Sequence, residues 1–367
     1  MPDSDPSRPS ILFLSSSFLT RRERKAMRGV QLFDMLLAAQ LLELGVDLTL
    51  PIESTWDRRL RERIDLSAAN VIRTPSLIKP LWNTLAAQSR VLKGRYDALI
   101  VGNPTRGLAP ALRTLRRKGR AGRITVLAHR TVKPGFARVI AGPGVTVVCV
   151  NKQIAAHARR LLPDAHVVTS YGIPDADRFS PRDTPPNPGA PVRFGVLGKL
   201  DNPWKGADDA IEAFNRIPEQ QRQRCELRLA SYERSDSRPV IDDDRIIAHD
   251  WMDSDQTPAF LRTLDVLLVP STSHETFSQA IVQGMLTGLP IIARDLPVLA
   301  EKLDTGAGVV AGDVQEMSQA MARLAGDASL RATMGAIARK TALERYAWDT
   351  RAFVRDYVLT GDPAVSS

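Results

Sequence analysis

The fold is decided by residues 273–285, which read SHETFSQAIVQGM and follow the apolar run VLLVP at 266–270. The pattern predicts a buried strand, then a polar turn that contains Glu275, then a helix with apolar residues at helical spacing. The stretch TGLPIIA at 287–293 ends that helix at a glycine and a proline and begins a second buried strand. Strand, turn, helix and strand form one unit of a parallel α/β sheet, in which ligands bind at the carboxyl ends of the strands.

The turn of this unit has the chemistry of a nucleotide-sugar site. The backbone N–H groups of Thr276, Phe277 and Ser278 are expected at the start of the helix, where they would point at an anion. Glu275 is suited to hold the hydroxyls of a neutral polyol, and Gln283 can offer its amide to a second hydroxyl pair. A diphosphate with two sets of hydroxyls describes a nucleoside-diphosphate-sugar.

These residues resemble the donor-site signature of the family 4 glycosyltransferases, which are retaining enzymes of the GT-B fold. That signature is a Glu, seven residues, a second Glu and a small-Gly-Leu-Pro turn, and here Gln283 replaces the second Glu. In the family, the second carboxylate accepts hydrogen bonds from the nucleotide ribose. An amide oxygen accepts such a bond without the strength that a charge adds. The resemblance implies the ribose role for Gln283 and places the 276–278 amides on the donor phosphates or sugar.

A second motif, GKLDNPWKG at 198–206, comes directly after a predicted strand and opens a helix. Gly198 allows close backbone approach, and Lys199 and Lys205 are two cations that could clamp a diphosphate. The motif resembles the family's Gly-Arg-Leu…Lys-Gly segment, with Lys199 as a point charge in place of the two-pronged arginine. A Lys-Gly pair before a helix is common elsewhere, so the phosphate interpretation depends on the neighbouring Glu275 signature.

Further donor contacts are implied by the resemblance. The stretch AHDWM at 248–252 corresponds to the segment with which the family lines the nucleobase, so Asp250 and Trp251 are predicted donor-site residues. A buried core position is an equally good interpretation of Trp251. His129 ends a strand and resembles the family's His near the transferred sugar, although a lone His is usually structural or surface-exposed. The predicted catalytic residues are Glu275, His129 and Lys205.

The chain length of 367 residues and a hydrophobic content of 43% favour two α/β domains with full cores. A proline-rich run can neither pair in a sheet nor continue a helix, so it predicts a stiff linker. The GT-B resemblance implies two Rossmann-like parallel-sheet domains that face across an interdomain cleft, and a last helix that crosses back to the first domain. The sequence alone predicts only a terminal helix there. The predicted parts are an N-terminal acceptor-binding domain at 1–184, the linker at 185–191, a C-terminal nucleotide-sugar domain at 192–345, and a final helix and tail at 346–367.

The net charge of +9 is unevenly distributed. Residues 1–190 hold 30 Lys and Arg against 15 Asp and Glu, whereas residues 191–367 hold 20 against 26. Between Val101 and Val150 there are ten basic residues and no acidic one. Such an uneven charge distribution predicts that the first half of the chain faces an anionic membrane leaflet, a pyrophosphoryl lipid or a nucleic acid. A solvated basic surface is the alternative.

The loop at 15–29 is one candidate contact for an anionic acceptor. It replaces the glycine-rich acceptor loop of the family, and Gly29 keeps the flexible position before the next helix. Its five basic residues, among them Arg21 and Arg22, suggest an acceptor that bears phosphate. A solvated loop explains them almost as well.

Two other stretches are candidate membrane contacts. Trp82 lies in LIKPLWNTL at 77–85 and suits a membrane interface, although a Trp-Leu stripe is more often ordinary core. The densest basic cluster is expected to touch anionic headgroups and contains Arg116, Arg117 and Lys118.

We therefore expect a hexosyltransferase that moves a hexose from a nucleoside-diphosphate-sugar to a lipid- or carrier-linked glycan acceptor in surface polysaccharide biosynthesis. The transfer would be retaining and assisted by the departing phosphate, with no metal or cofactor, because two lysines and the helix dipole neutralise the leaving group. Two alternatives remain open. One is a GT-B enzyme with a soluble acceptor, or a nucleotide-sugar epimerase. The other is a non-catalytic relative that binds polyanions or nucleic acid, which only the charge supports.

The sequence also predicts where the protein works. It has no run of about 18 apolar residues that could span a bilayer, and residues 1–10 do not resemble a secretory signal. Cys149 and Cys225 lie far apart in strand-like runs, which is typical of reduced thiols. We expect a cytoplasmic protein, peripheral at the inner face of the membrane if its basic half binds lipid, and no nucleic acid partner.

Overall fold

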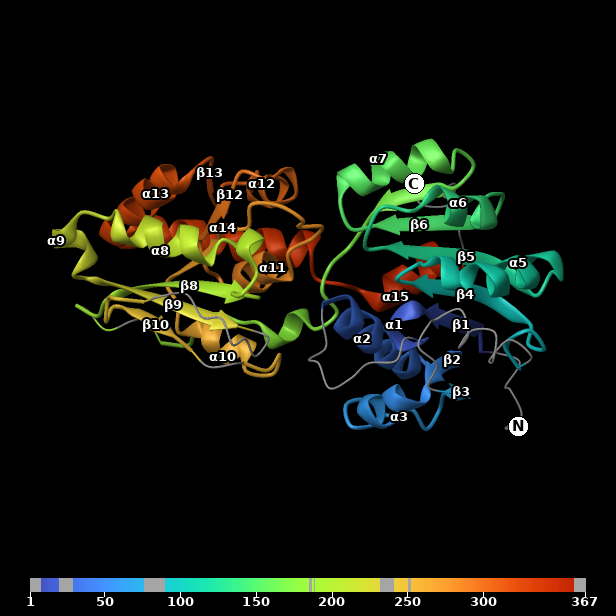
Figure 1. Cartoon of the computed structure of the whole chain (residues 1–367). Helices are drawn as coiled ribbons and strands as arrows, with labels where there is room; N and C mark the ends of the chain where they lie inside the picture. Colours follow the sequence, from blue (N-terminus) through green and yellow to red (C-terminus); the bar gives the residue numbers. More distant parts are fainter. Residues whose placement is uncertain are drawn as a thin grey trace. The chain divides into compact units, whose positions relative to one another are not determined.

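The computed structural model describes residues 8–19, 29–75, 90–184, 187, 189–231, 241–249 and 252–359. The chain divides into two compact units (Figure 1). The first unit contains residues 1–174 and 348–367, and the second contains residues 175–347. The chain therefore leaves the first unit once and returns to it once.

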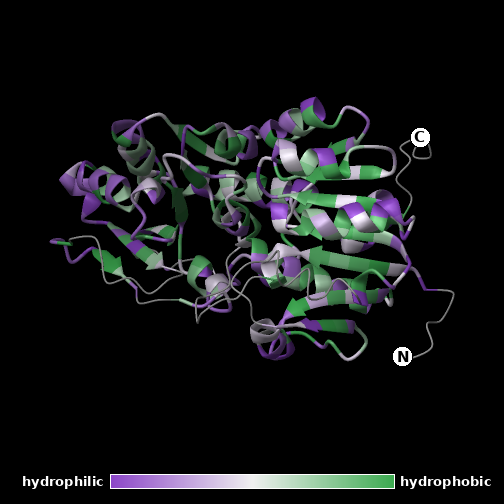
Figure 2. Cartoon of the chain, turned by 45° about the vertical axis from the view of Figure 1, so that its right-hand side comes forward, coloured by the Kyte–Doolittle hydropathy of each residue, from purple (hydrophilic) through white to green (hydrophobic). Residues whose placement is uncertain are grey.

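The first unit is built on a sheet of seven parallel strands in the order β3-β2-β1-β4-β5-β6-β7. Its inner strands are buried on both faces, which is why their sequences are continuous apolar runs rather than alternating ones (Figure 2). The strands are β1 (Ser10–Ser15), β2 (Asp47–Glu53), β3 (Asn70–Thr74), β4 (Tyr96–Gly102), β5 (Ala121–Ala128), β6 (Val145–Cys149) and β7 (His166–Thr169).

The helices of the first unit are mostly amphipathic and bury one face against this sheet. Helix α5 buries Ala111, Leu112 and Leu115 and leaves its basic side chains on the other face. Asn151 caps α7, since its side chain accepts a hydrogen bond of 2.7 Å from the N–H of Ile154. The helices are α1 (Ser16–Leu19), α2 (Gly29–Glu43), α3 (Ser54–Arg61), η1 (Arg106–Leu108), α5 (Ala109–Arg117), α6 (Pro134–Ile140), α7 (Lys152–Leu161), α15 (Thr350–Phe353) and the π-helix η4 (Val354–Leu359).

The second unit has a sheet of six parallel strands in the order β10-β9-β8-β11-β12-β13. Its strands are β8 (Val192–Gly198), β9 (Cys225–Ser231), β10 (Ile246–Ala248), β11 (Val266–Val269), β12 (Ile291–Arg294) and β13 (Gly308–Ala311). Its helices are η2 (Ala176–Arg178), η3 (Pro203–Lys205), α8 (Ala207–Asn215), α9 (Glu219–Arg222), α10 (Thr257–Arg262), α11 (Gln279–Leu286), α12 (Pro297–Leu303), α13 (Val314–Gly326) and α14 (Ala328–Arg345).

Each sheet has one topological switch point, where successive strands begin to be added on the other side. It lies between β1 and β4 in the first unit and between β8 and β11 in the second. In open parallel sheets, ligands bind beyond the carboxyl ends of the strands at this point. The residues that follow these four strands are therefore where functional side chains are expected.

The division between the units differs from the boundary at residue 184 that the proline-rich run predicted. Residues just before that run already pack in the second unit. Arg178 Nη2 lies 2.9 Å from Asp255 Oδ1, and Arg182 Nη2 lies 2.6 Å from Asp265 Oδ1. Residues 185, 186 and 188 of the predicted linker lie outside the described residues. Ion pairs on the basic side chains thus draw the segment before the prolines into the second unit.

Candidate active site

The switch point of the second unit carries the predicted phosphate-binding motif. Strand β8 ends at Gly198 and pairs with β11, which ends at Val269. The loops that follow these strands approach each other and line one pocket. That pocket is lined by residues of both strands and both loops, among them Gly198, Lys205, Ser271, Glu275 and Ser278. The structure thus brings the two predicted motifs together at the position where a parallel sheet binds ligands.

Glu275 and Lys205 form the ion pair at the centre of this pocket. Lys205 Nζ donates to Glu275 Oε1 at 2.5 Å, and Ser271 Oγ donates to the same oxygen at 2.9 Å. The Glu275 side chain is 7% exposed and that of Lys205 is 24% exposed. The ammonium group also lies 4.6 Å from the centre of the Trp204 ring. Both charges are therefore fixed in a partly dry site, where electrostatic interactions are stronger than in water.

Gly206 explains how the two loops come this close. It has a φ of 70°, and a Cβ atom at this position would lie 2.2 Å from the carbonyl oxygen of Pro270. Only glycine allows both the left-handed backbone and the close approach. The N–H of Thr272 then donates to the Trp204 carbonyl at 2.8 Å, which ties the second loop to the first. The Lys205–Glu275 geometry follows from this backbone contact.

The expected helix start at Thr276 is wrong, because α11 begins only at Gln279. The loop before it is strained, since His274 and Ser278 have φ values of 58° and 60° without being glycines. Residues 276–278 therefore precede the helix rather than form its first turn. Such a backbone persists only where surrounding contacts hold it, and it is typical of functional loops.

The remaining predicted donor residues have mixed outcomes. Gly198 is buried at the end of β8, and Lys199 follows it as a half-buried residue. Gln283 lies on α11 and is 6% exposed, so the predicted ribose partner is an almost fully buried side chain. Asp250 and Trp251 lie outside the described residues.

A second polar cluster, around His129, lies beside the switch point of the first unit, because Ser15 ends β1 and His129 follows β5, the strand next to β4. His129 Nδ1 lies 2.9 Å from the Tyr171 hydroxyl, and His129 Nε2 lies 3.6 Å from Asp34 Oδ1. The other Asp34 oxygen accepts a 2.6 Å hydrogen bond from Ser15 Oγ at the end of β1. Burial and the charge of Asp34 raise the pKa of Tyr171 well above its ordinary value. The Tyr171 hydroxyl therefore stays protonated and forms a hydrogen bond with His129 Nδ1.

His129 is not the open, cleft-facing residue that its place after a strand suggested. It is only 2% exposed, and its ring packs against Phe33 at 5.4 Å between ring centres and against Tyr171 at 5.2 Å. Asp34 is fully buried. The sequence contained a signal for Asp34 that was missed, namely one carboxylate inside the apolar helix LFDMLL.

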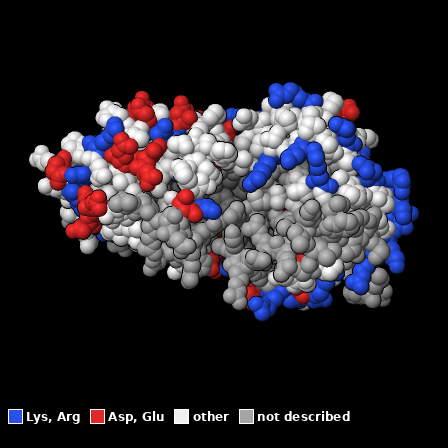
Figure 3. Space-filling model, in the orientation of Figure 1, with Lys and Arg blue, Asp and Glu red and all other residues white. Residues whose placement is uncertain are grey.

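The basic surface predicted for the first half lies on the first unit. Figure 3 shows Lys and Arg gathered over that unit, whereas acidic residues are more frequent on the second. At the end of α5, Arg117 and Lys118 are exposed, but Arg116 is half-buried and donates to the carbonyls of Val139 and Ile140. Arg116 is thus partly structural. Gly29 is the first residue of α2, and Arg21, Arg22 and Trp82 lie outside the described residues.

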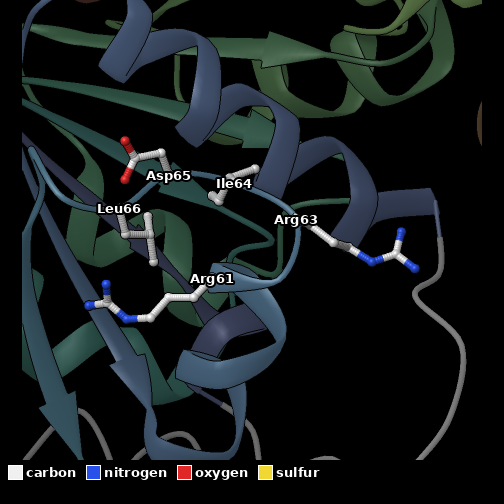
Figure 4. Close-up of a pocket in the computed structure, with 5 residues that line it drawn as sticks. All are labelled: Arg61, Arg63, Ile64, Asp65 and Leu66. Atoms are coloured by element: carbon white, nitrogen blue, oxygen red, sulfur yellow. The ribbon is translucent and has the colours of Figure 1, made fainter.

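One further hollow lies after α3 and is lined by residues 61 and 63–66. Figure 4 shows the side chains of Arg61 and Arg63 pointing in opposite directions. Arg61 is also paired with Asp57 at 2.9 Å. Because its cationic groups do not converge, this hollow has no features of a binding site. Within the described ranges, no three His, Cys, Asp or Glu side chains are grouped to hold a metal ion.

Comparisons with known proteins show similarity to glycosyltransferases. Residues 191–327 match the family Glycosyl transferases group 1. Over 218 residues the chain is 27% identical to the 2-deoxystreptamine glucosyltransferase of Streptomyces kanamyceticus. This alignment covers 57% of the chain and 52% of that relative, so the chain spans about half of the relative's length. Over 346 residues it is 25% identical to the phosphatidyl-myo-inositol mannosyltransferase of Mycobacterium leprae (strain TN), which covers 87% of the chain and 89% of that relative.

A solved structure shares the fold of both units. The structure of Anabaena Alr3699/HepE in complex with UDP superposes with a TM-score of 0.67 and 17% identity, and covers 92% of this chain and 96% of that one. The predicted fold of two parallel-sheet α/β domains, the GT-B fold, is confirmed. The match makes residues 191–327 similar to a glycosyltransferase domain. The matched description is that of group 1, and the matched residues include the Lys205–Glu275 pair.

Proposed function

We propose that the protein is a retaining hexosyltransferase that uses a nucleoside-diphosphate-sugar. The Lys205–Glu275 pair at the switch point of the second unit carries this proposal. The pair lines a pocket, lies inside the matched glycosyltransferase region, and joins a cation suited to a diphosphate with a carboxylate suited to sugar hydroxyls. UDP in the similar Anabaena protein, and the glucosyl- and mannosyltransferase relatives, support a hexose donor of this kind.

In this proposal the site residues stabilise the charges that develop in the transition state of sugar transfer. When the bond between the sugar and the diphosphate breaks, negative charge develops on the leaving group and positive charge on the sugar carbon. Lys205 and Lys199 would interact more strongly with the leaving group in that transition state than with the bound donor, which lowers the barrier. Glu275 would accept hydrogen bonds from sugar hydroxyls and hold the reacting carbon in place. The departing phosphate oxygen would then take the proton of the acceptor hydroxyl on the same face.

For the acceptor, we infer a lipid- or carrier-linked glycan of a surface polysaccharide pathway, with the enzyme at an anionic membrane surface. The basic surface of the first unit and the phosphatidyl-myo-inositol mannosyltransferase relative support this inference. The 2-deoxystreptamine glucosyltransferase relative favours a second candidate, a small soluble acceptor. No helix within the described parts of the chain is long and apolar enough to cross a bilayer.

The first test is the thermal stability of the purified protein with UDP, GDP, ADP and dTDP. A nucleotide at a hundred times its dissociation constant adds about 2.7 kcal/mol of stability. We expect a clear rise in Tm with one nucleotide, and its loss in Lys205→Ala. Lys340→Ala, at an exposed position on α14, is the matched control and keeps the rise. If no nucleotide stabilises the wild-type protein, the proposed donor site is refuted.

A further inference from the structure

A buried lysine contacts the candidate donor loop through Phe277 and takes no part in the chemistry described above. Lys302, on α12, is 0% exposed. Its Nζ donates to the carbonyl of Val298 at 3.0 Å and lies 3.8 Å from Glu301 Oε1. Lysine is almost never fully buried unless its ammonium group has partners, because burial removes the hydration of the charge.

The ammonium group is held between two aromatic rings. Its Nζ lies 4.7 Å from the centre of the Phe277 ring and 5.5 Å from that of Tyr346. The two rings meet edge to face with centres 6.1 Å apart. A cation is attracted to the negative face of an aromatic ring, and the attraction is stronger where water is excluded. Lys302 is therefore in a position to attract the Phe277 ring.

Phe277 belongs to the strained part of the donor loop. It comes two residues after Glu275 and lies between His274 and Ser278, the two residues of this loop with positive φ. A backbone of this kind relaxes unless contacts hold it. The buried Phe277 ring, 5% exposed, is a contact that anchors the loop to the core.

We propose that Lys302 is a positioning residue of the donor site, whose buried ammonium ion holds Phe277 and so fixes the loop that carries Glu275. The proposal rests on the proposed function, because it assigns donor binding to Glu275 and Lys205. It goes further in naming a side chain that touches no substrate and yet sets donor affinity. A merely structural lysine predicts the opposite pattern, a lower Tm in its absence with nucleotide affinity unchanged. For a positioning lysine the Tm should not fall, since replacing a buried charge with an apolar group of similar volume is often neutral or stabilises the fold.

The charge of Lys302 also gives the site a pH dependence. Burial lowers the pKa of Lys302 to about 8, and the nearby carboxylates of Glu301 and Glu275 oppose this shift. The other ionisable group that faces the ammonium is Tyr346, whose pKa burial raises to about 12, with Arg345 and Asp304 beside it. As the pH rises through about 8 the lysine loses its proton and no longer attracts the ring, so donor affinity should fall progressively in this range.

The test is nucleotide affinity by calorimetry for the wild-type protein and Lys302→Met, with the diphosphate that stabilises the wild type as the probe. At pH 7 we expect Kd to rise about tenfold in Lys302→Met, with an unchanged or higher Tm. From pH 7 to 9 the wild-type Kd should rise, and that of the variant should stay flat. Lys340→Met controls for the loss of a lysine on an exposed surface and should change neither quantity.

A second variant keeps the proposal testable if Lys302→Met does not fold. Phe277→Leu should raise Kd by a similar factor, and combining the two substitutions should add little, because both remove one contact. If Lys302→Met or Phe277→Leu binds the nucleotide as the wild type does, the positioning role is overturned while the donor site stands. If the wild-type protein binds none of the four diphosphates, the proposed function itself fails.

Discussion

Each unit has buried or half-buried polar residues at or beside the switch point of its parallel sheet, but the two groups differ in exposure. In the second unit, Lys205 and Glu275 line a pocket, and the lysine remains 24% exposed. In the first unit, Ser15, Asp34 and His129 are 0–2% exposed and interact with one another and with Tyr171. A cation that still reaches solvent can meet an incoming anion, whereas a closed cluster stabilises its own strand ends. Topology therefore gives the two locations, and the exposure of the charged side chains distinguishes the proposed donor site from the buried cluster.

The largest effect is expected for Glu275→Gln in the second unit. The amide keeps the size of the side chain but removes the charge that pairs with Lys205 and that, in the proposed function, orients the sugar. We expect kcat for sugar transfer to fall by about 10²–10³, measured by release of the nucleoside diphosphate. Full turnover in Glu275→Gln would refute the assignment of this site. Glu344→Gln, on the exposed part of α14, is the control and should keep the wild-type rate.

A smaller effect concerns the buried charge of the second unit. The pKa of Lys302 is lowered to about 8 in the folded protein from an ordinary 10.5. Between these values the unfolded chain binds more protons, so stability rises with pH in this window. Relative to Lys302→Met, the wild type should gain up to about 3 kcal/mol between pH 8 and pH 10.5. Urea unfolding at several pH values measures this, and parallel curves would contradict it.

The first unit is tested by Asp34→Asn, which removes the buried charge that faces His129. We expect a loss of about 1–3 kcal/mol in the free energy of unfolding, because the polar groups around position 34 lose a charged partner. Nucleotide affinity should stay at the wild-type value, since the cluster belongs to the other sheet. Asp164→Asn, at an exposed site after α7, provides the control. A large change in nucleotide affinity in Asp34→Asn would show that the two switch points act as one site.

The smallest expected effect is at the surface. Neutralising Arg117 and Lys118 with Gln should weaken binding to vesicles with anionic lipid by about 1 kcal/mol for each residue. Sedimentation with vesicles of phosphatidylcholine and phosphatidylglycerol measures the bound fraction. The same change at Arg224 and Lys340, exposed residues of the second unit, should have little effect. Equal losses in both units would mean that no one surface faces the membrane.

Most of both sheets could be predicted from the sequence, because fully buried parallel strands are short apolar runs. Strands β3 and β13 were missed, since both lie at sheet edges and carry exposed residues. The start of α11 was placed too early for a related reason. Phe277 fits a helical period, but its burial comes from Lys302 and Tyr346. The spacing of apolar residues predicts which side chains are buried, but it does not predict which other residues bury them.

The candidate site was predictable where a local motif carries its chemistry. Lys205 and Glu275 are 70 residues apart, yet each lies in its own recognisable loop, and the sheet brings the loops together. Asp34 and Lys302 have no such motif. Their importance depends on which distant side chains bury them, and that information appears only once the chain is folded.

The chain passes from the first unit to the second after Pro174 and returns before Trp348, and this order affects folding during synthesis. The N–H of Trp348 donates to the carbonyl of Ile173 at 3.2 Å, so the second unit is an insertion whose two ends meet. The η4 segment lies against β4, β5 and β6, and Thr125 Oγ1 donates to the Tyr357 carbonyl at 2.5 Å. Those strands leave the ribosome long before residues 354–359 do. The inserted unit can therefore complete its core first, while the unit begun earliest is finished last.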